Sequence, residues 1–261
     1  RWLSQPPGEN VLTAWEWYKP VERIGSGPSA PLPVADASSA TLTSSAIKDA
    51  VDYAKAFDSI AFLVAHKGVL QVEMYSEGYD RATVLDSQSM HKGLLGVAAA
   101  LALDKGLIPS VDTLASEYIP AWVTDDRASI TVQHLLEMTS GLAQADFSPS
   151  PFSPGQRLFF GNNLDGPVEK MPLAFAPGTQ FDFNHVNSQA LHAVITGATG
   201  MRYADFVRDY LWRPLGGGFA QVRLDHPGGT ARTFCCIQLR PMDWVRLGVM
   251  LANGGRADDQ Q

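Results

Sequence analysis

The sequence predicts an α+β protein in which an antiparallel sheet is flanked by helices and continues into a mostly helical region. Two observations support this fold class. β-rich runs lie early in the chain on both sides of Lys67-Gly68, and helical patterns dominate from residue 85 onward. A two-stranded hairpin is not stable by itself, and few further strands can be recognised. We therefore expect the sheet to be incomplete in this chain.

Four segments follow from the composition of the 261 residues. An irregular N-terminal arm rich in Pro, Ser, Gly and Ala comes first. An α/β part follows, with an amphipathic helix, the hairpin and a long apolar helix closed by Gly106. A mostly helical region with a long loop comes next, and the chain then returns to the α/β part, where we expect it to stop before the last strands. The four segments are residues 1–42, 43–106, 107–230 and 231–261.

The later elements follow from glycine and proline positions as well as from periodicity. A long stretch rich in Pro and Gly at residues 147–166 predicts a loop, and loops of this length on a rigid scaffold often carry specificity. The apolar run ARTFCCIQL, residues 231–239, predicts a buried extended segment. Helical patterns end at three glycines, which are Gly141, Gly200 and Gly254.

Composition and charge exclude several classes of function. The net charge of −7, without any basic run, argues against a nucleic-acid partner, and no apolar stretch is long enough for a membrane span. No HExxH, HxH or CxxC spacing is present, so a metal site is not expected. Neighbouring cysteines rarely bridge each other. We therefore expect Cys235 and Cys236 to be buried, unbridged and inert.

Two Ser-x-x-Lys pairs occur in the chain, and their surroundings differ. Ser45 and Lys48 lie on an amphipathic helix among acidic residues, where a lysine is normally solvated. Ser89 and Lys92 lie at the start of an apolar helix, where both side chains share one face and can meet. One interpretation is catalytic, because a helix N-terminus favours negative charge near Ser89. The other is an N-cap serine with a lysine that reaches out to solvent.

The environment of Lys92 bears on this choice. The helix that follows it is apolar on nearly every side, which indicates burial. Burial lowers the pKa of an amine, so we expect Lys92 to be neutral in a large share of molecules near pH 7. A neutral amine beside a hydroxyl is the base that a serine nucleophile needs.

Several blocks along residues 55–256 resemble the serine β-lactamase and penicillin-binding superfamily: FLVAHKGVLQVEMYSEGYD, SMHKGLLGVAAALALDKG, ITVQHLLEMTSGL, APGTQFDFNHVNSQAL, YLWRPLG and RTFCCIQLRPMDWVRLGVMLANGG. Within it, the chain is most similar to class C β-lactamase-like serine hydrolases, in the esterase and 6-aminohexanoate-dimer hydrolase branch. The resemblance implies a β-lactamase/transpeptidase-like fold, Ser89 as the acylated nucleophile and Lys92 as its activator, without a cofactor. The family continues with further strands, so the resemblance also implies that this chain lacks the C-terminal part.

Two departures from the family pattern bear on activity. Where the family has Tyr-x-Asn, this chain has Phe183-Asn184-His185, so the hydroxyl that relays protons is missing. His185 either bonds Lys92 or replaces the tyrosine as acid and base, or it is a structural residue at a helix start. The third motif, Lys-Thr-Gly or His-x-Gly on a strand, is also missing. His226-Pro227-Gly228 precedes the last helix and is expected to be a turn.

We therefore expect a serine hydrolase that cleaves an ester or amide bond through an acyl-enzyme. The alternative is a catalytically silent, penicillin-binding-like protein that binds a peptide, lactam or cell-wall fragment. In both cases the partner is a small molecule, and the sequence leaves the oligomeric state and the compartment open, with export slightly favoured. The expected catalytic residues are Ser89, Lys92 and His185, and the expected substrate contacts are Phe183, Asn184 and Phe160.

Overall fold

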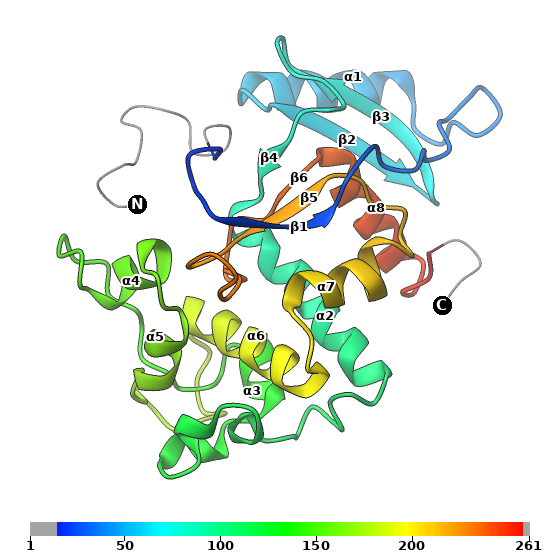
Figure 1. Ribbon diagram of the computed structural model, residues 1–261. Helices are drawn as coiled ribbons and strands as arrows, with labels where there is room; N and C mark the ends of the chain where they lie inside the picture. The colour runs from blue at the N-terminus through cyan, green and yellow to red at the C-terminus, as the bar shows by residue number, and fades with distance from the viewer. Residues whose placement is uncertain (1–14, 258–261) are drawn as a thin grey trace. The chain divides into compact units, whose positions relative to one another are not determined.

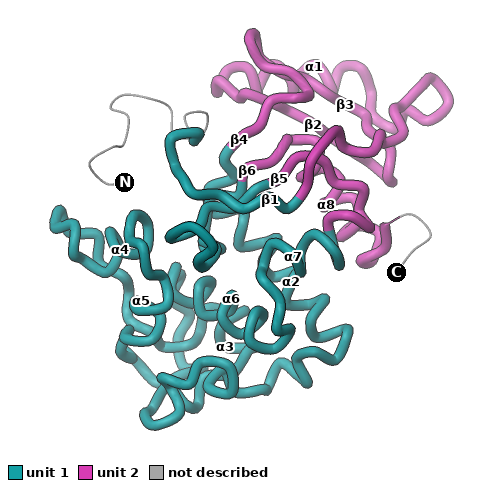
Figure 2. The backbone as a smooth tube through the Cα atoms, in the orientation of Figure 1, with its two compact units in different colours: residues 1–24, 86–211, 221–237 teal, residues 25–85, 212–220, 238–261 magenta. Residues whose placement is uncertain are grey.

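The computed structural model describes residues 15–257. Residues 1–14 of the predicted arm and residues 258–261 lie outside the described residues. The chain divides into two compact units, and each unit is built from three stretches of sequence (Figure 2). Unit 1 comprises residues 1–24, 86–211 and 221–237, and unit 2 comprises residues 25–85, 212–220 and 238–261.

Unit 2 contains the predicted hairpin. Strand β2 (Ala61–His66) pairs antiparallel with strand β3 (Val69–Tyr75). The two residues between them, Lys67 and Gly68, have positive φ values of 52° and 79°. A two-residue hairpin turn of this kind needs both residues in that region, because the turn must match the twist of the strands. The hairpin prediction is confirmed.

Unit 2 also contains two helices, α1 and α8 (Figure 1). Helix α1 (Ser44–Ala56) begins after Thr43, whose Oγ1 accepts a hydrogen bond from the Ala46 N–H at 3.3 Å. Thr43 is therefore the N-cap. Helix α8 (Pro241–Ala252) starts with its proline in the first turn and packs against β2.

The core of unit 1 is formed by helices (Figure 1). Helix α2 (His91–Asp104) packs against α6 (His185–Thr199), and α3 (Val132–Leu136) packs against α6 as well. Leucines and alanines form most of the buried face of α2, and small side chains allow two helices to approach closely. Helix α6 ends at Gly200, whose φ of 65° lies in the left-handed region that favours glycine. Packing of α2 on α6 brings residue 92 close to residue 185.

The remaining elements are short. In unit 1, strand β1 lies beside β5, and the predicted α+β class is confirmed. None of the helices between residues 15 and 257 has both the length and the apolar composition needed to cross a membrane. The other bounds among the described residues are β1 (Val21–Gly25), β4 (Leu85–Asp86), β5 (Ala220–Arg223), β6 (Gln238–Leu239), α4 (Pro154–Phe160), α5 (Asp165–Lys170), α7 (Tyr203–Val207), the 3-10 turns Gln88–Met90, Ala115–Glu117, Pro120–Trp122 and Asp126–Ser129, and a π-helical turn (Arg208–Trp212).

Three expectations about elements need correction. The arm predicted as irregular contains strand β1. The predicted loop at residues 147–166 contains helix α4, which begins with Ser153 as N-cap and Pro154 in the first turn. This pair is a helix-start signal, and the high Pro and Gly content of the stretch hid it. Residues 231–239 are buried as predicted, but only the last two form a strand, because the chain turns at the adjacent cysteines.

Candidate active site

Ser89 lies in the 3-10 turn Gln88–Met90, directly before helix α2. Its side chain is exposed, and neither the turn nor the helix has a side-chain cap, so the N-cap interpretation of Ser89 is wrong. Gln88 has a φ of 49°, which is uncommon for a residue other than glycine and typical of turns that the surrounding structure fixes. The buried Asp86 fixes this one: it accepts from the Gln88 N–H at 2.9 Å and from Arg223 at 2.6 Å.

Lys92 reaches three groups with its ammonium nitrogen, and all of them belong to unit 1. The Nζ lies 3.4 Å from the Ser89 Oγ and 3.1 Å from the Nδ1 of His185, and it also donates to the backbone carbonyl of Phe234. The alternative in which Lys92 extends into solvent does not fit these contacts. Helix α2, helix α6 and the segment before β6 therefore meet at this one nitrogen.

Burial governs the protonation of this cluster. It lowers the pKa of Lys92 to about 8, because the charged form loses hydration. Burial, together with the neighbouring charge of Lys92, lowers the pKa of His185 to about 4. At pH 7 a pKa near 8 leaves roughly one lysine in ten neutral. The predicted direction of the Lys92 shift is thus confirmed, but the neutral share is smaller than expected from the sequence.

His185 is the first residue of helix α6 and is half-buried. Its low pKa makes it neutral at pH 7, so its Nδ1 can accept a hydrogen bond from Lys92. The structure thus brings Ser89, Lys92 and His185 into one hydrogen-bonded chain. The roles of these three residues stay a proposal, which is developed below.

Phe183 stands where the resemblance places the tyrosine of the second motif. Its ring centroid lies 5.1 Å from the Lys92 Nζ and 5.6 Å from that of His185, and the residue is 49% exposed. The ring therefore lies beside the lysine. It has no hydroxyl, so it can shield Lys92 but cannot move a proton.

Asn184 and Phe160 were also expected to contact substrate. Asn184 is fully buried, donates to the carbonyls of Leu142 and Ala143, and accepts from the Val186 N–H as the N-cap of α6. It holds the helix that carries His185, and we do not retain it as a substrate contact. Phe160 is half-buried at the end of α4, and its ring packs against Phe159 at 6.4 Å.

The adjacent cysteines overturn the expectation that they are unbridged. Cys235 and Cys236 form a disulfide, and Cys236 has a φ of 74°. The Cys235 carbonyl bonds the Nδ1 of the buried His91 at 2.9 Å, and the Cys236 N–H donates to the Gln88 carbonyl at 2.8 Å. The bridged pair thus contacts both the turn that carries Ser89 and the helix that carries Lys92.

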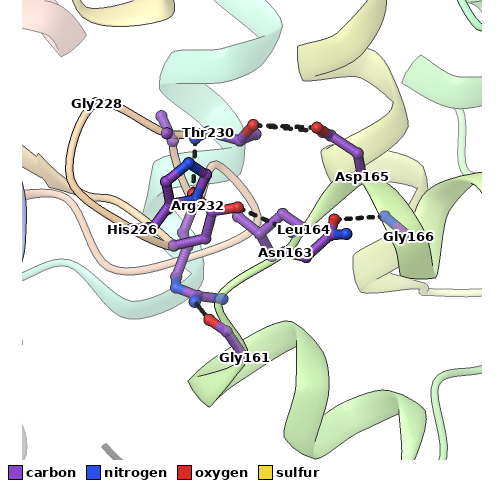
Figure 3. Close-up of polar contacts among 12 residues, drawn as sticks. Gly161, Asn163, Leu164, Asp165, Gly166, His226, Gly228, Thr230 and Arg232 are labelled. Carbon is purple, nitrogen blue, oxygen red and sulfur yellow. Dashed lines mark hydrogen bonds and ion pairs between the residues drawn. The ribbon is translucent and has the colours of Figure 1, made fainter.

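A second set of hydrogen bonds holds the segments that carry Phe159 and Phe234, whose rings lie near His185. Arg232 donates to the carbonyl of Gly161, and Thr230 lies 3.3 Å from the carboxylate of Asp165 (Figure 3). The buried Asp225 accepts from the backbone N–H of residue 164 at 3.0 Å and from those of residues 226 and 230 at 2.8 Å each. These bonds tie the end of α4 to the segment before β6.

The turn at His226-Pro227-Gly228 is part of this anchor. Gly228 has a φ of 72°, and the Gly229 N–H donates to the His226 carbonyl at 2.9 Å. The prediction of a turn is confirmed. The turn lies between Asp225 and Thr230, which are hydrogen-bonded to each other. The residues that match His-x-Gly therefore have a structural role here, in supporting the site.

Sequence reasoning missed three phenylalanines that surround His185. The ring centroids of Phe147, Phe159 and Phe234 lie 6.2, 5.7 and 5.6 Å from the imidazole centroid. Phe147 and Phe159 are spaced by 12 positions in the predicted loop and showed no periodicity that could reveal a shared environment. Their aromatic character within a stretch otherwise rich in Pro, Ser and Gly was the one available signal.

Metal ligation does not account for this cluster. Within residues 15–257, no group of three or more His, Cys, Asp or Glu side chains is placed to hold a metal ion. The imidazole of His185 is occupied by its contact with Lys92. What the arrangement can do is activate a hydroxyl with a desolvated amine.

Comparisons with known proteins fit this geometry. The family described as Beta-lactamase matches residues 45–239, whereas no curated protein matches the chain. A Bacillus anthracis protein assigned as a 6-aminohexanoate-dimer hydrolase is 19% identical, with a TM-score of 0.77, and the match covers 100% of this chain and 73% of that chain.

Two further solved structures are similar. The hydrolase EstCE1, described as having promiscuous acyltransferase activity, is 17% identical with a TM-score of 0.62, covering 82% of this chain and 73% of that chain. A class C β-lactamase is 18% identical with a TM-score of 0.62, covering 83% and 67%. At these identities the structural likenesses establish the fold and leave the substrate open.

Proposed function

Because the chain belongs to the β-lactamase family, a family of serine hydrolases, we propose that it cleaves an ester or amide bond through an acyl-enzyme on Ser89. One observation carries the proposal: an amine with a pKa lowered to about 8 lies 3.4 Å from an exposed serine hydroxyl at a helix start. A hydroxyl is a weak nucleophile by itself, and a neighbouring base of suitable pKa activates it.

The proposed reaction has two halves. In the first, the Ser89 Oγ attacks the carbonyl carbon while its proton passes to the Lys92 Nζ. The bond to the leaving alcohol or amine then breaks, and the leaving atom takes that proton from Lys92. In the second half, water attacks the acyl-enzyme while Lys92 accepts a proton from the water, and Lys92 then donates that proton to the Ser89 Oγ as the acid departs.

Oxyanion stabilisation is proposed to come from the backbone. The N–H of Ser89 lies in the turn before α2, where the helix dipole favours negative charge. Such donors stabilise the tetrahedral intermediate because they are already oriented when the charge develops. The resemblance implies a second donor from a strand, which we leave unassigned.

His185 is proposed to orient Lys92. A pKa of about 4 makes the imidazole an acceptor at neutral pH, and its 3.1 Å contact directs one Lys92 N–H away from Ser89. The Phe234 carbonyl accepts a second N–H, so the neutral amine can point its lone pair at the serine. A role for His185 as the proton relay in place of tyrosine is the alternative to be tested.

A catalytically silent protein that binds a peptide, lactam or cell-wall fragment is the second candidate. It is favoured by Phe183, which occupies the place of the family tyrosine 5.1 Å from the Lys92 Nζ and offers no hydroxyl. In that case Ser89 and Lys92 would line a binding site without completing turnover.

Covalent labelling separates the two candidates. Treatment with a fluorophosphonate, followed by tryptic mass spectrometry, should place the adduct on Ser89 and leave Ser45 unmodified. Ser89→Ala is the matched control and should take no label. Labelling of Ser45, or of neither serine in folded protein, would refute the acyl-enzyme proposal. Labelling of Ser89 without release of alcohol from any ester would support the silent candidate.

A further inference from the structure

The four phenylalanines around His185 differ in exposure. Phe234 is fully buried, and its ring packs against Phe159 at a centroid distance of 4.8 Å. Phe147 and Phe183 are 48% and 49% exposed, and each ring lies edge-on to His185. Phe234 and the half-buried Phe159 form a support, and Phe147 and Phe183 present aromatic surface to solvent directly beside the catalytic candidates.

The support is rigid. The Phe159 carbonyl accepts a hydrogen bond from the buried Tyr18 hydroxyl, and the bond from Arg232 to Gly161 ties the end of α4 to the segment that carries Phe234 (Figure 3). A rigid support keeps the exposed rings in one place, which a specific contact needs.

Phe147 is placed by a glycine. A Cβ atom at Gly155 would lie 2.6 Å from the Phe147 Cγ, so any larger residue there would displace the ring. The Gly155 N–H also donates to the Asp146 carbonyl at 2.8 Å. The first turn of α4 therefore seats the Phe147 ring, whose centroid lies 5.2 Å from that of Phe159.

Proton transfer determines which part of a substrate these rings would meet. In the proposed reaction the leaving atom must take its proton from Lys92, so it must come within hydrogen-bond distance of the Nζ. Phe183 lies 5.1 Å from that nitrogen, and Phe147 lies on the same imidazole that Lys92 contacts. The half-exposed rings therefore flank the leaving group.

We infer that the site selects an uncharged, aryl-bearing leaving group, meaning an arylalkyl alcohol or amine, with Phe147 and Phe183 as the specificity-determining residues. The inference rests on the proposed function. The aryl group is favoured because aromatic pairs gain stability beyond the burial of area. The leaving group is expected to be uncharged because the acidic groups near the site are already bonded, Asp86 to Arg223 and Asp182 to Gln144. A flat ring fits this surface better than a saturated ring of the same size.

Acetate esters test the inference, because a shared acetyl-enzyme makes the second half of the reaction identical for all of them. We compare 2-phenylethyl acetate, 2-cyclohexylethyl acetate and 4-acetoxybutanoate by the alcohol released in the first turnover. The wild type should favour the phenyl ester over the cyclohexyl ester by roughly threefold to tenfold, and the carboxylate-bearing ester should be the slowest. Equal rates for the two ring esters, or a faster carboxylate ester, would overturn the inference.

Two variants and a control test whether the Phe147 ring causes the preference for the phenyl ester. Phe147→Leu should bring the phenyl-to-cyclohexyl ratio close to one, and Gly155→Ala, which blocks the place of the ring, should lower the same ratio. Phe152→Leu is the control, because Phe152 is 73% exposed and lines a different hollow of unit 1, of about 590 Å³. A ratio that Phe147→Leu leaves unchanged contradicts the assignment.

The outcomes for the two proposals are distinguishable. Absence of alcohol release together with absence of a fluorophosphonate adduct on Ser89 overturns the proposed function, and this inference with it. An adduct on Ser89 without any preference among the esters overturns only the inference about the leaving group.

Discussion

The chain carries the same four-residue motif twice, and the two copies have opposite environments. In α1 of unit 2, Lys48 is 74% exposed and pairs with Asp52 at 2.5 Å, one turn away. In α2 of unit 1, Lys92 is half-buried and donates to Ser89, to the Phe234 carbonyl and toward His185. The spacing of serine and lysine is identical in the two copies, so spacing alone does not make a site.

The pKa values of the two lysines are shifted in opposite directions. The hydrogen bond with Asp52 raises the pKa of Lys48 above its usual value, which keeps the amine charged. Burial lowers the pKa of Lys92 to about 8. A carboxylate partner keeps Lys48 protonated at neutral pH, so that it cannot accept a proton, whereas burial makes the neutral, proton-accepting form of Lys92 accessible. The chemical identity of the neighbours distinguishes the two copies.

The largest difference should appear when each lysine is replaced by methionine. Lys92→Met removes the base and should lower the rate of alcohol release from 4-nitrophenyl acetate by about 10²–10⁴-fold. Lys48→Met should leave that rate unchanged, because its partner is a solvated carboxylate. Stopped-flow absorbance of the first turnover measures both. Equal losses in the two variants would show that the comparison is wrong.

The pH dependence should follow Lys92. Its neutral form is the active base, so the first-turnover rate should rise about tenfold from pH 7 to pH 9 and level off above the pKa of about 8. The same shift affects folding: the unfolded chain binds the proton more tightly, so the free energy of unfolding should increase from pH 8 towards pH 10.5 through this group. A rate that is flat between pH 7 and pH 9 contradicts the assignment of Lys92 as base.

For Lys48 the free energy of unfolding depends on pH with the opposite sign. Its raised pKa favours the folded state while the lysine is charged, and this contribution is lost as the pH rises through the folded pKa. Urea titrations of wild type and Lys48→Met below and above the usual lysine pKa of about 10.4 isolate that group, and titrations of Lys92→Met between pH 8 and about pH 10.5 isolate the other.

A smaller effect is expected from restoring a hydroxyl at position 183. Phe183→Tyr places an acceptor and donor near the Lys92 Nζ and should raise the first-turnover rate by about threefold to tenfold, at little cost in stability because the position is half-exposed. If His185 already relays protons, Phe183→Tyr should change little and His185→Ala should abolish turnover. Loss of rate on Phe183→Tyr would contradict both.

The smallest effects concern stability. Ser89 makes no cap bond, so Ser89→Ala should change the free energy of unfolding by less than about 0.5 kcal/mol. Thr43 does cap α1, so Thr43→Ala should cost about 1 kcal/mol. Chemical denaturation of the two variants checks the contrast. A larger loss for Ser89→Ala would mean that the hydroxyl supports the turn.

Periodic and capped elements could be predicted from the sequence. The hairpin at Lys67-Gly68 follows from its turn residues, and α2 and α6 follow from long helical patterns that end near glycines. Strands β1 and β5 are only five and four residues long. Their pairing joins segments far apart in the chain, which no local pattern shows.

Part of the candidate site could also be predicted from the sequence. Ser89 and Lys92 share one helical face, and the resemblance added His185 and Phe183, which the packing of α2 and α6 brings together. The bonds from the Asn184 amide to backbone carbonyls of a distant segment could not be predicted from a local pattern. The Phe234 carbonyl that holds Lys92 could not be predicted, since backbone atoms of every residue look alike in a sequence.

Reduction of the disulfide between Cys235 and Cys236 can report how fast the segment around it opens. The two residues are only 3% and 2% exposed, and a thiolate must reach a sulfur atom directly to cleave a disulfide. An added dithiol can therefore react only after the segment from 234 to 237 has opened. At saturating dithiol, the rate of reduction equals the rate of opening of the segment that holds Lys92. That motion can be timed without attaching any probe.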